Sequence, residues 1–169
     1  MFLGKPLWQI NTEKCLKIFD RVYVSSDDIE LLHAAWSLGA IPLERGPELC
    51  GDTPNIPVYQ HALEKMGDTE ALVAVQVCSP NVPERLIRIA KMLMESGIHE
   101  VMTCHPIEHK DEYHDQSFKI YGSVWGISAE LLRKYPDPYK PNPWTLLVDK
   151  SIDIHTEEDF EAAIRQASL

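Results

Sequence analysis

The sequence predicts a doubly wound α/β fold, on two observations. Short β-branched or aromatic runs alternate along the chain with longer segments whose apolar residues recur at helical spacing. The most continuous apolar run, Ala71 to Val77, is typical of a central parallel strand that is buried on both faces. We therefore expect a mostly parallel sheet with helices on both faces, built as a single domain over residues 1–169.

Each expected element has its own local signal. Pro6 suits the first turn of a helix to about Phe19, Ser26 or Asp27 suits the cap of the next helix, and Gly39 ends that helix. Pro42 makes its strand an edge strand, because proline cannot donate to a ladder. The expected strands are 22–25, 40–43, 71–77, 100–103, 121–127 and 145–148. The expected helices are 6–19, 26–39, 57–65, 81–97, 129–134 and 157–167.

Composition excludes two classes of partner. The chain has a net charge of −10, whereas binding nucleic acid or an anionic membrane surface needs a face of lysine and arginine. No apolar run approaches the roughly 20 residues that cross a bilayer, and the apolar start at Met1 is too short for a secretory signal. We expect a cytoplasmic protein with neither a nucleic-acid nor a membrane partner.

Cysteine and histidine spacing gives no metal motif. The four cysteines fit no zinc or redox spacing, so core positions are expected for all of them; they are Cys15, Cys50, Cys78 and Cys104. His105, His109 and His114 alternate with acidic residues, but their irregular spacing favours a solvated loop over a metal cluster.

Polar residues follow three of the expected strands, where α/β sheets bind their ligands. The three segments are Ser25 to Asp28, Gln76 to Pro80, and Asp153 to Thr156; the last is expected to end a strand that begins at Ser151 and runs into the helix 157–167. We expect Asp27 to cap a helix. Gln76 ends a buried strand, so its side-chain amide needs hydrogen-bond partners.

Asp153 and His155 lie two residues apart, so on an extended chain they face the same side and could share one cation. Mg²⁺ would take the Asp153 carboxylate and waters, while the imidazole suits Mn²⁺ or Zn²⁺ better. A helix cap is the alternative role for Asp153.

Several blocks, in order along the chain, resemble the acylneuraminate cytidylyltransferases (CMP-sialic acid synthetases). These blocks are Gly4 to Leu7, Phe19 to Asp27, Arg45 to Thr53, His61 to Glu64, Gln76 to Pro80, and Ser151 to Phe160. The resemblance implies a nucleotide-diphospho-sugar transferase-like fold and transfer of CMP from CTP to a sialic-acid-like sugar acid, with Mg²⁺ as cofactor.

The resemblance also implies roles for individual residues. Arg45, Asp52 and Thr53 would border the nucleotide, and Gln76 and Ser79 would face the sugar acid. Asp153 would be catalytic with Gln76 and would hold the metal with His155. Lys119 falls where the family has an arginine, and would meet a carboxylate as a point charge.

The chain departs from the family pattern at four places. It contains no first strand followed by a basic, glycine-rich triphosphate loop, so we expect weak CTP binding and unpaired strand edges. His155 replaces an aspartate, Cys78 with Asn81-Val82 replaces a threonine and a Leu-Arg pair, and the segment between Cys104 and Tyr121 is short. Any homodimer would therefore form through a face that the family does not use.

Two functions follow from these observations. One is a cytidylyltransferase that makes CMP-activated sugar acids for surface glycans. The other is a non-catalytic paralogue that binds a sugar acid or a protein partner with the retained half of the pocket.

Overall fold

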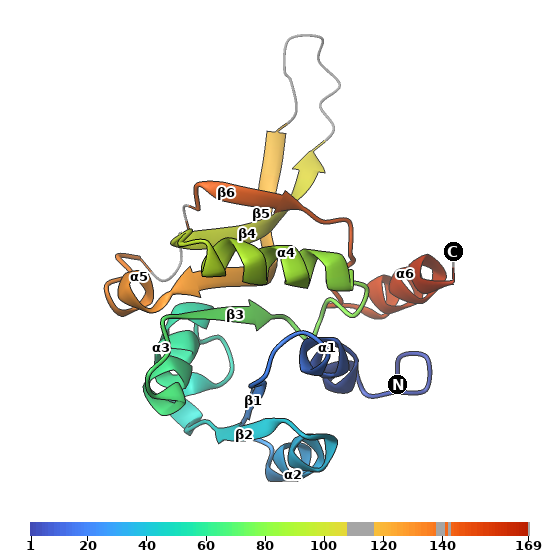
Figure 1. Cartoon of the computed structure of the whole chain (residues 1–169). Helices are drawn as coiled ribbons and strands as arrows, with labels where there is room; N and C mark the ends of the chain where they lie inside the picture. Colours follow the sequence, from blue (N-terminus) through green and yellow to red (C-terminus); the bar gives the residue numbers. More distant parts are fainter. Residues whose placement is uncertain (108–116, 138–140, 142, 169) are drawn as a thin grey trace.

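A computed structural model describes residues 1–107, 117–137, 141 and 143–168 of the chain, in which strands and helices alternate as predicted (Figure 1). The strands are β1 (Tyr23–Ser26), β2 (Ile41–Glu44), β3 (Ala71–Val75), β4 (Glu100–Ile107), β5 (Ser117–Ser128) and β6 (Thr145–Val148). The α-helices are α1 (Leu7–Leu16), α2 (Ile29–Leu38), α3 (Asn55–Met66), α4 (Glu84–Glu95), α5 (Ala129–Arg133) and α6 (Glu157–Ala167).

The strands form two sheets. β1 and β2 pair in parallel, while the larger sheet has the order β3-β5-β4-β6. In the larger sheet β4 and β6 are parallel, and β5 runs antiparallel to both β3 and β4. Strands β3, β4 and β6 therefore share one direction, and β5 is reversed.

Helices cover both faces of the four-stranded sheet, which confirms the doubly wound architecture. On one face α3 and α5 pack against the sheet around Trp125 and Leu132. On the other face α1 and α4 pack around Val101 and Ile87, and Figure 1 shows α4 lying in front of the sheet, roughly along its strands. Gly126 of β5 allows this approach, because an added Cβ would lie 2.8 Å from Val101 Cγ1 and 2.9 Å from Met94 Cγ.

Strand β3 lies at an edge, so the prediction of a central parallel strand at Ala71 to Val77 is wrong. Its partner is the antiparallel β5, and no described strand pairs with its other side. The residues are apolar because both faces of β3 are covered: Leu72 packs with α3 and α5, and Val73 packs with α1 and α4. Burial on two faces gives the same sequence pattern at an edge as in the centre.

The division into two sheets agrees with the expectation that the family's first strand is lacking. Among the described strands, β1 pairs only with β2, and β3 pairs only with β5. In the view of Figure 1 the two-stranded sheet lies below β3, and β1 is nearer to β3 than β2 is. The chain thus has two strand edges whose backbone groups no described strand pairs.

The start of α2 corrects one prediction about a cap. Its N-cap is Asp28, whose Oδ1 accepts from the backbone N–H of Glu30 at 2.9 Å and of Leu31 at 3.1 Å. Ser26 and Asp27 therefore do not cap the helix. Gly39 ends it as predicted, with a φ of 101° that favours glycine.

Among the described residues, each helix is too short or too polar to span a bilayer. The His109 and His114 segment lies outside the described residues.

Candidate functional site at the ends of β3 and β6

Polar side chains gather where the chain leaves β3. Gln76 donates from Nε2 to the Tyr59 hydroxyl at 2.7 Å, and its backbone N–H donates to the Ser123 carbonyl at 2.9 Å. Ser79 is 1% exposed, and its hydroxyl lies 2.9 Å from the hydroxyl of Tyr121. The amide of Gln76 thus has the partner that its position at a strand end requires, and Ser79 joins the end of β3 to β5.

Helix α1 fixes this strand-end loop. Asn11 is 2% exposed, and its Nδ2 donates to the carbonyls of Gln76 at 2.7 Å and Ser79 at 2.9 Å. Lys14 Nζ donates to Asn11 Oδ1 at 2.9 Å, to the Pro80 carbonyl at 2.5 Å and to the Val82 carbonyl at 2.9 Å. Burial lowers the pKa of Lys14. Sequence reasoning missed both residues, although a helix with a polar residue on its buried face was a usable signal.

A buried polar network holds the segment that follows β6. Asp149 is 1% exposed; its Oδ2 accepts from the hydroxyls of Ser123, at 2.5 Å, and Ser151, and its Oδ1 accepts from the Ser151 N–H at 3.0 Å. The Ser123 hydroxyl lies 2.7 Å from that of Thr103, which extends the network to β4. Sequence reasoning missed Asp149. The network sets the position from which the chain runs on to Asp153.

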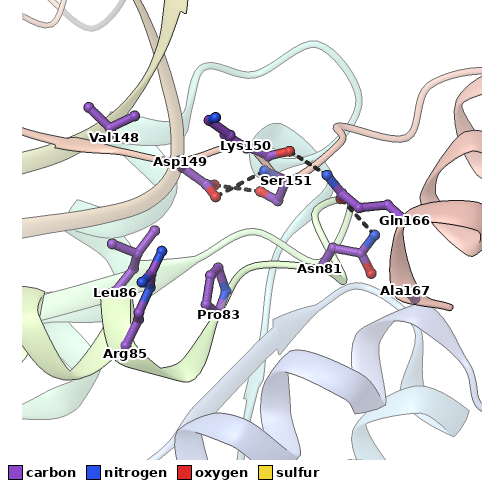
Figure 2. A pocket seen from close by; sticks show the side chains of 10 residues that line it. All are labelled: Asn81, Pro83, Arg85, Leu86, Val148, Asp149, Lys150, Ser151, Gln166 and Ala167. Atoms are coloured by element: carbon purple, nitrogen blue, oxygen red, sulfur yellow. Dashed lines mark hydrogen bonds between the residues drawn. The ribbon is translucent and has the colours of Figure 1, made fainter. Parts of the chain in front are cut away.

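Residues Ser151 to Ile154 carry no ladder pairing, so the prediction of a strand running into α6 is wrong for this segment. This segment contacts the β3 loop through a backbone bond from the Ile154 N–H to the Cys78 carbonyl at 2.8 Å. Further along, Asn81 Nδ2 donates to Gln166 Oε1 at 2.8 Å, and Gln166 Nε2 donates to the Lys150 carbonyl at 2.7 Å (Figure 2). The loops after β3 and β6 are therefore joined.

Asp153 has one carboxylate oxygen engaged and one without a partner. Its Oδ2 lies 2.6 Å from His155 Nε2, as their spacing predicts. Its Oδ1 is buried and has no hydrogen-bond partner among the described residues. The cap of α6 is Thr156, which forms a capping box with Asp159, so Asp153 is not a helix cap. A buried carboxylate oxygen without a donor is a position for a cation or a ligand hydroxyl.

Two groups beside Asp153 remain protonated at neutral pH. Burial, together with the adjacent Asp153 carboxylate, raises the pKa of Cys78 to about 12. Burial chiefly raises the pKa of Tyr121 well above its ordinary value, against the opposing effect of the hydrogen bond with Ser79. The site therefore offers a neutral thiol and a neutral phenol beside one carboxylate, and Cys78 is half-buried rather than a fully buried core residue.

Arg45, Asp52 and Thr53 lie together on the loop after β2. Arg45 Nη2 is 3.5 Å from Asp27 Oδ1 in an ion pair. Thr53 Oγ1 donates to the Cys50 carbonyl at 2.9 Å, and Asp52 is exposed. Among the described residues, no hydrogen bond or ion pair joins this loop to Gln76, Ser79 or Asp153.

Lys119 lies on β5 opposite His105 and is exposed. The His105 ring is 4.2 Å from the ring of Tyr121, centroid to centroid, and among the described residues no hydrogen bond or ion pair joins Lys119 to Asp153.

The residues fit a divalent cation through Asp153. Across the described ranges, no three histidine, cysteine or acidic side chains lie together as a metal site. Asp153 Oδ1 would thus be the carboxylate ligand of Mg²⁺, with the remaining ligands from water or a phosphate. His155 would be a second ligand only if its nitrogen left Asp153 Oδ2, and an imidazole favours Mn²⁺. Hydrogen-bond donors and one carboxylate at a strand end suit binding of a polar ligand.

Comparison with known proteins reveals related folds. The chain is similar to CMP:2-keto-3-deoxy-manno-octonic acid synthetase complexed with CTP, with a TM-score of 0.79 and 12% identity over 99% of this chain and 90% of that chain. It is similar to 4-diphosphocytidyl-2C-methyl-D-erythritol synthase from Anaerococcus prevotii, with a TM-score of 0.71 and 13% identity over 98% and 87%.

A third similar structure is HddC from Yersinia pseudotuberculosis, with a TM-score of 0.65 and 13% identity over 99% of this chain and 88% of that one. No family model and no curated protein sequence matches the chain. At this identity the matches show the fold alone, and the chain has the nucleotide-diphospho-sugar transferase-like fold that the sequence predicts.

Proposed function

We propose that this protein is a cytidylyltransferase homologue that transfers CMP from CTP to a sialic-acid-like or related sugar acid, for surface glycan synthesis. The similar structures support a CTP-using reaction, because two of them are named for cytidylyl products and one is complexed with CTP. The sequence blocks that resemble the acylneuraminate cytidylyltransferases support a sugar acid as the acceptor.

One observation carries the proposal: the buried Oδ1 of Asp153 has no partner among the described residues, beside the loop that holds Gln76 and Ser79. An unsatisfied buried carboxylate oxygen costs about 1–3 kcal/mol or more, so a ligand at this position would stabilise the folded protein. A cation held there would lie at the edge of the sheet where α/β proteins bind phosphates.

The proposed reaction forms a bond from the anomeric oxygen of the sugar acid to the α-phosphorus of CTP. The bond from that phosphorus to the oxygen bridging to the β-phosphate breaks, pyrophosphate leaves, and the proton of the anomeric hydroxyl passes to solvent water. Gln76 and Ser79 would orient the sugar acid, and the exposed Lys119 would meet its carboxylate. Arg45, Asp52 and Thr53 would border the nucleotide. Mg²⁺ bound at Asp153 would neutralise charge on the phosphates.

A pyrophosphate-release assay with millimolar CTP, Mg²⁺ and a panel of sugar acids tests the proposal. We expect release that depends on one of the acids and that falls at least about tenfold in Asp153→Asn. Asp137→Asn, a carboxylate outside the proposed site, is the control and should leave release unchanged.

We expect weak CTP binding by the 169-residue chain alone, because its sequence contains no basic glycine-rich loop. Micromolar CTP affinity in calorimetry would contradict that expectation.

A second candidate, a non-catalytic paralogue that binds a sugar acid or a protein partner, is favoured by one observation. The guanidinium of Arg45 already pairs with Asp27 and donates to the Leu49 carbonyl at 3.4 Å. Binding of a sugar acid without pyrophosphate release, in the presence of CTP and Mg²⁺, would support this alternative. A protein that shows neither sugar-acid binding nor pyrophosphate release would contradict both functions.

A further inference from the structure

A cavity of about 390 Å³ lies beside the strand-end site, between the start of α4 and the end of β6. Figure 2 shows its walls: the loop at Asn81 and Pro83, the first turn of α4, the residues after Val148, and the end of α6 at Gln166. The size falls in the range of small-molecule pockets, which is roughly 300–1,000 Å³. None of the residues given a role in the proposed reaction lines it, so the inference does not depend on that function.

The charges that this cavity presents to solvent are cationic. Arg85 and Lys150 line it from opposite walls and are exposed, and neither has an ion-pair partner among the described residues. The third charged lining residue, Asp149, is 1% exposed, and three donated hydrogen bonds from Ser123 and Ser151 satisfy its carboxylate. In a chain with a net charge of −10, two cations facing one cavity without acidic partners favour an anionic ligand.

The remaining lining residues indicate which chemical group can lie beside the anion. Leu86 is buried at the base, and Pro83, Val148 and Ala167 add apolar surface. The side-chain amides of Asn81 and Gln166 are hydrogen-bonded to each other and to backbone carbonyls. They therefore connect the loop before α4, the end of α6 and the segment after β6. The cavity is several times larger than an inorganic phosphate, which leaves room for an apolar group beside the anion.

We propose that this cavity binds a small phosphate monoester. The phosphate bridges Arg85 on α4 and Lys150 after β6, because a dianion matches two monocations and guanidinium groups pair with phosphate oxygens in a fork. The ester group lies against Leu86 and Val148. Since the two walls continue into Ser79 and Asp153, the bound ester also tightens the two loops that carry the strand-end site.

Ligand-observed NMR titration with phenyl phosphate tests this proposal in the full chain. We expect saturable binding, weaker binding of inorganic phosphate, and no saturable binding of phenol. In a separate protein-observed 15N spectrum, the side-chain amide signals of Asn81 and Gln166 should shift on binding. Arg85→Gln and Lys150→Gln should each weaken binding about fivefold, the value for an exposed charge contact.

Arg88→Gln is the matched control. It lies one turn further along α4, carries the same charge, does not line the cavity, and has its guanidinium 3.6 Å from Glu84. It should change the affinity by less than about twofold. Equal affinity in all four proteins, or binding that is lost in Asp153→Asn but kept in Arg85→Gln and Lys150→Gln, would overturn the proposal. Phenyl phosphate bound no more tightly than inorganic phosphate would overturn the ligand class.

Discussion

Asp153 and His155 are the two residues of the cation site that we propose. In the family that the sequence resembles, an aspartate stands where this chain has His155, and here the imidazole occupies one oxygen of Asp153 at 2.6 Å. Compared with a pair of aspartates, Asp153 and His155 have one negative charge fewer and offer one nitrogen atom as a metal ligand. Since imidazole suits Mn²⁺ better than Mg²⁺, we expect the preference of the site to differ from that of two carboxylates.

A thermal unfolding series tests the role of His155. Saturating Mn²⁺ should raise the unfolding midpoint more than Mg²⁺ does in the wild type, by about 2–4 °C for each kcal/mol of binding free energy. His155→Asp should reverse that order. Equal shifts with both ions, unchanged in the variant, would show that the pair is structural.

Cys78 offers a second test at the residue scale, because its thiolate is the reactive form. With a pKa of about 12, only about one thiol in ten thousand is ionised at pH 8. The alkylation rate should therefore keep rising with pH up to about 12 instead of levelling near 9. Asp153→Asn removes the neighbouring negative charge, so it should lower the pKa and speed alkylation at pH 8. Site-resolved mass spectrometry after iodoacetamide treatment measures this, with Asp52→Asn as the control.

At the scale of elements, α1 holds the strand-end loop through Asn11 and Lys14. Asn11→Ala would leave the buried carbonyls of Gln76 and Ser79 without their donor, and we expect a loss of about 1–3 kcal/mol in the free energy of unfolding. Hydrogen exchange should become faster over residues 76–82. Urea denaturation measures the stability.

Gln9→Ala is the control for Asn11→Ala, because the Gln9 side chain bonds within its own helix, to Glu13. It should cost less than about 0.5 kcal/mol. Asn11→Ala that leaves both stability and exchange unchanged would show that α1 does not fix the loop.

The strands and helices could be predicted from local pattern, but several contacts could not. The apolar pattern located β6 and α6 correctly, since its signals lie within a few residues. The position of β3 at an edge and the bonds from Asn11 to residues 65 and 68 positions away depend on pairing and packing that no local pattern records. The cap of α2, Asp28, lies one residue beyond the predicted Asp27, because adjacent aspartates give the same capping signal in sequence.

At the scale of the whole molecule, the two open strand edges predict association. The even-numbered residues of β1 face β2, since Val22 and Ser26 accept from β2-side N–H groups at 2.7 and 3.0 Å. Tyr23 and Ser25 therefore direct their backbone groups to the open side. We expect a concentration-dependent dimer through this edge, a face that the resembled family does not use.

Light scattering in 0.15 M salt tests this expectation, which predicts a rise toward twice the 19.3 kDa chain mass with concentration. Ser25→Pro removes a donor on the open side and should abolish the dimer without disturbing the β1–β2 pairing. Circular dichroism checks that this variant is folded. A wild type that is strictly monomeric would show that the open edges do not pair between copies.

We infer that Gln76, Ser79 and Asp153 form the substrate site of a cytidylyltransferase homologue. A two-dimensional amide NMR titration with CTP, Mg²⁺ and a nine-carbon sugar acid added together tests this inference. We expect saturable shifts centred on residues 76–79, 153–155 and the neighbouring Tyr121, and their loss in Asp153→Asn. Shifts elsewhere in the chain, or none at millimolar ligand, would contradict it.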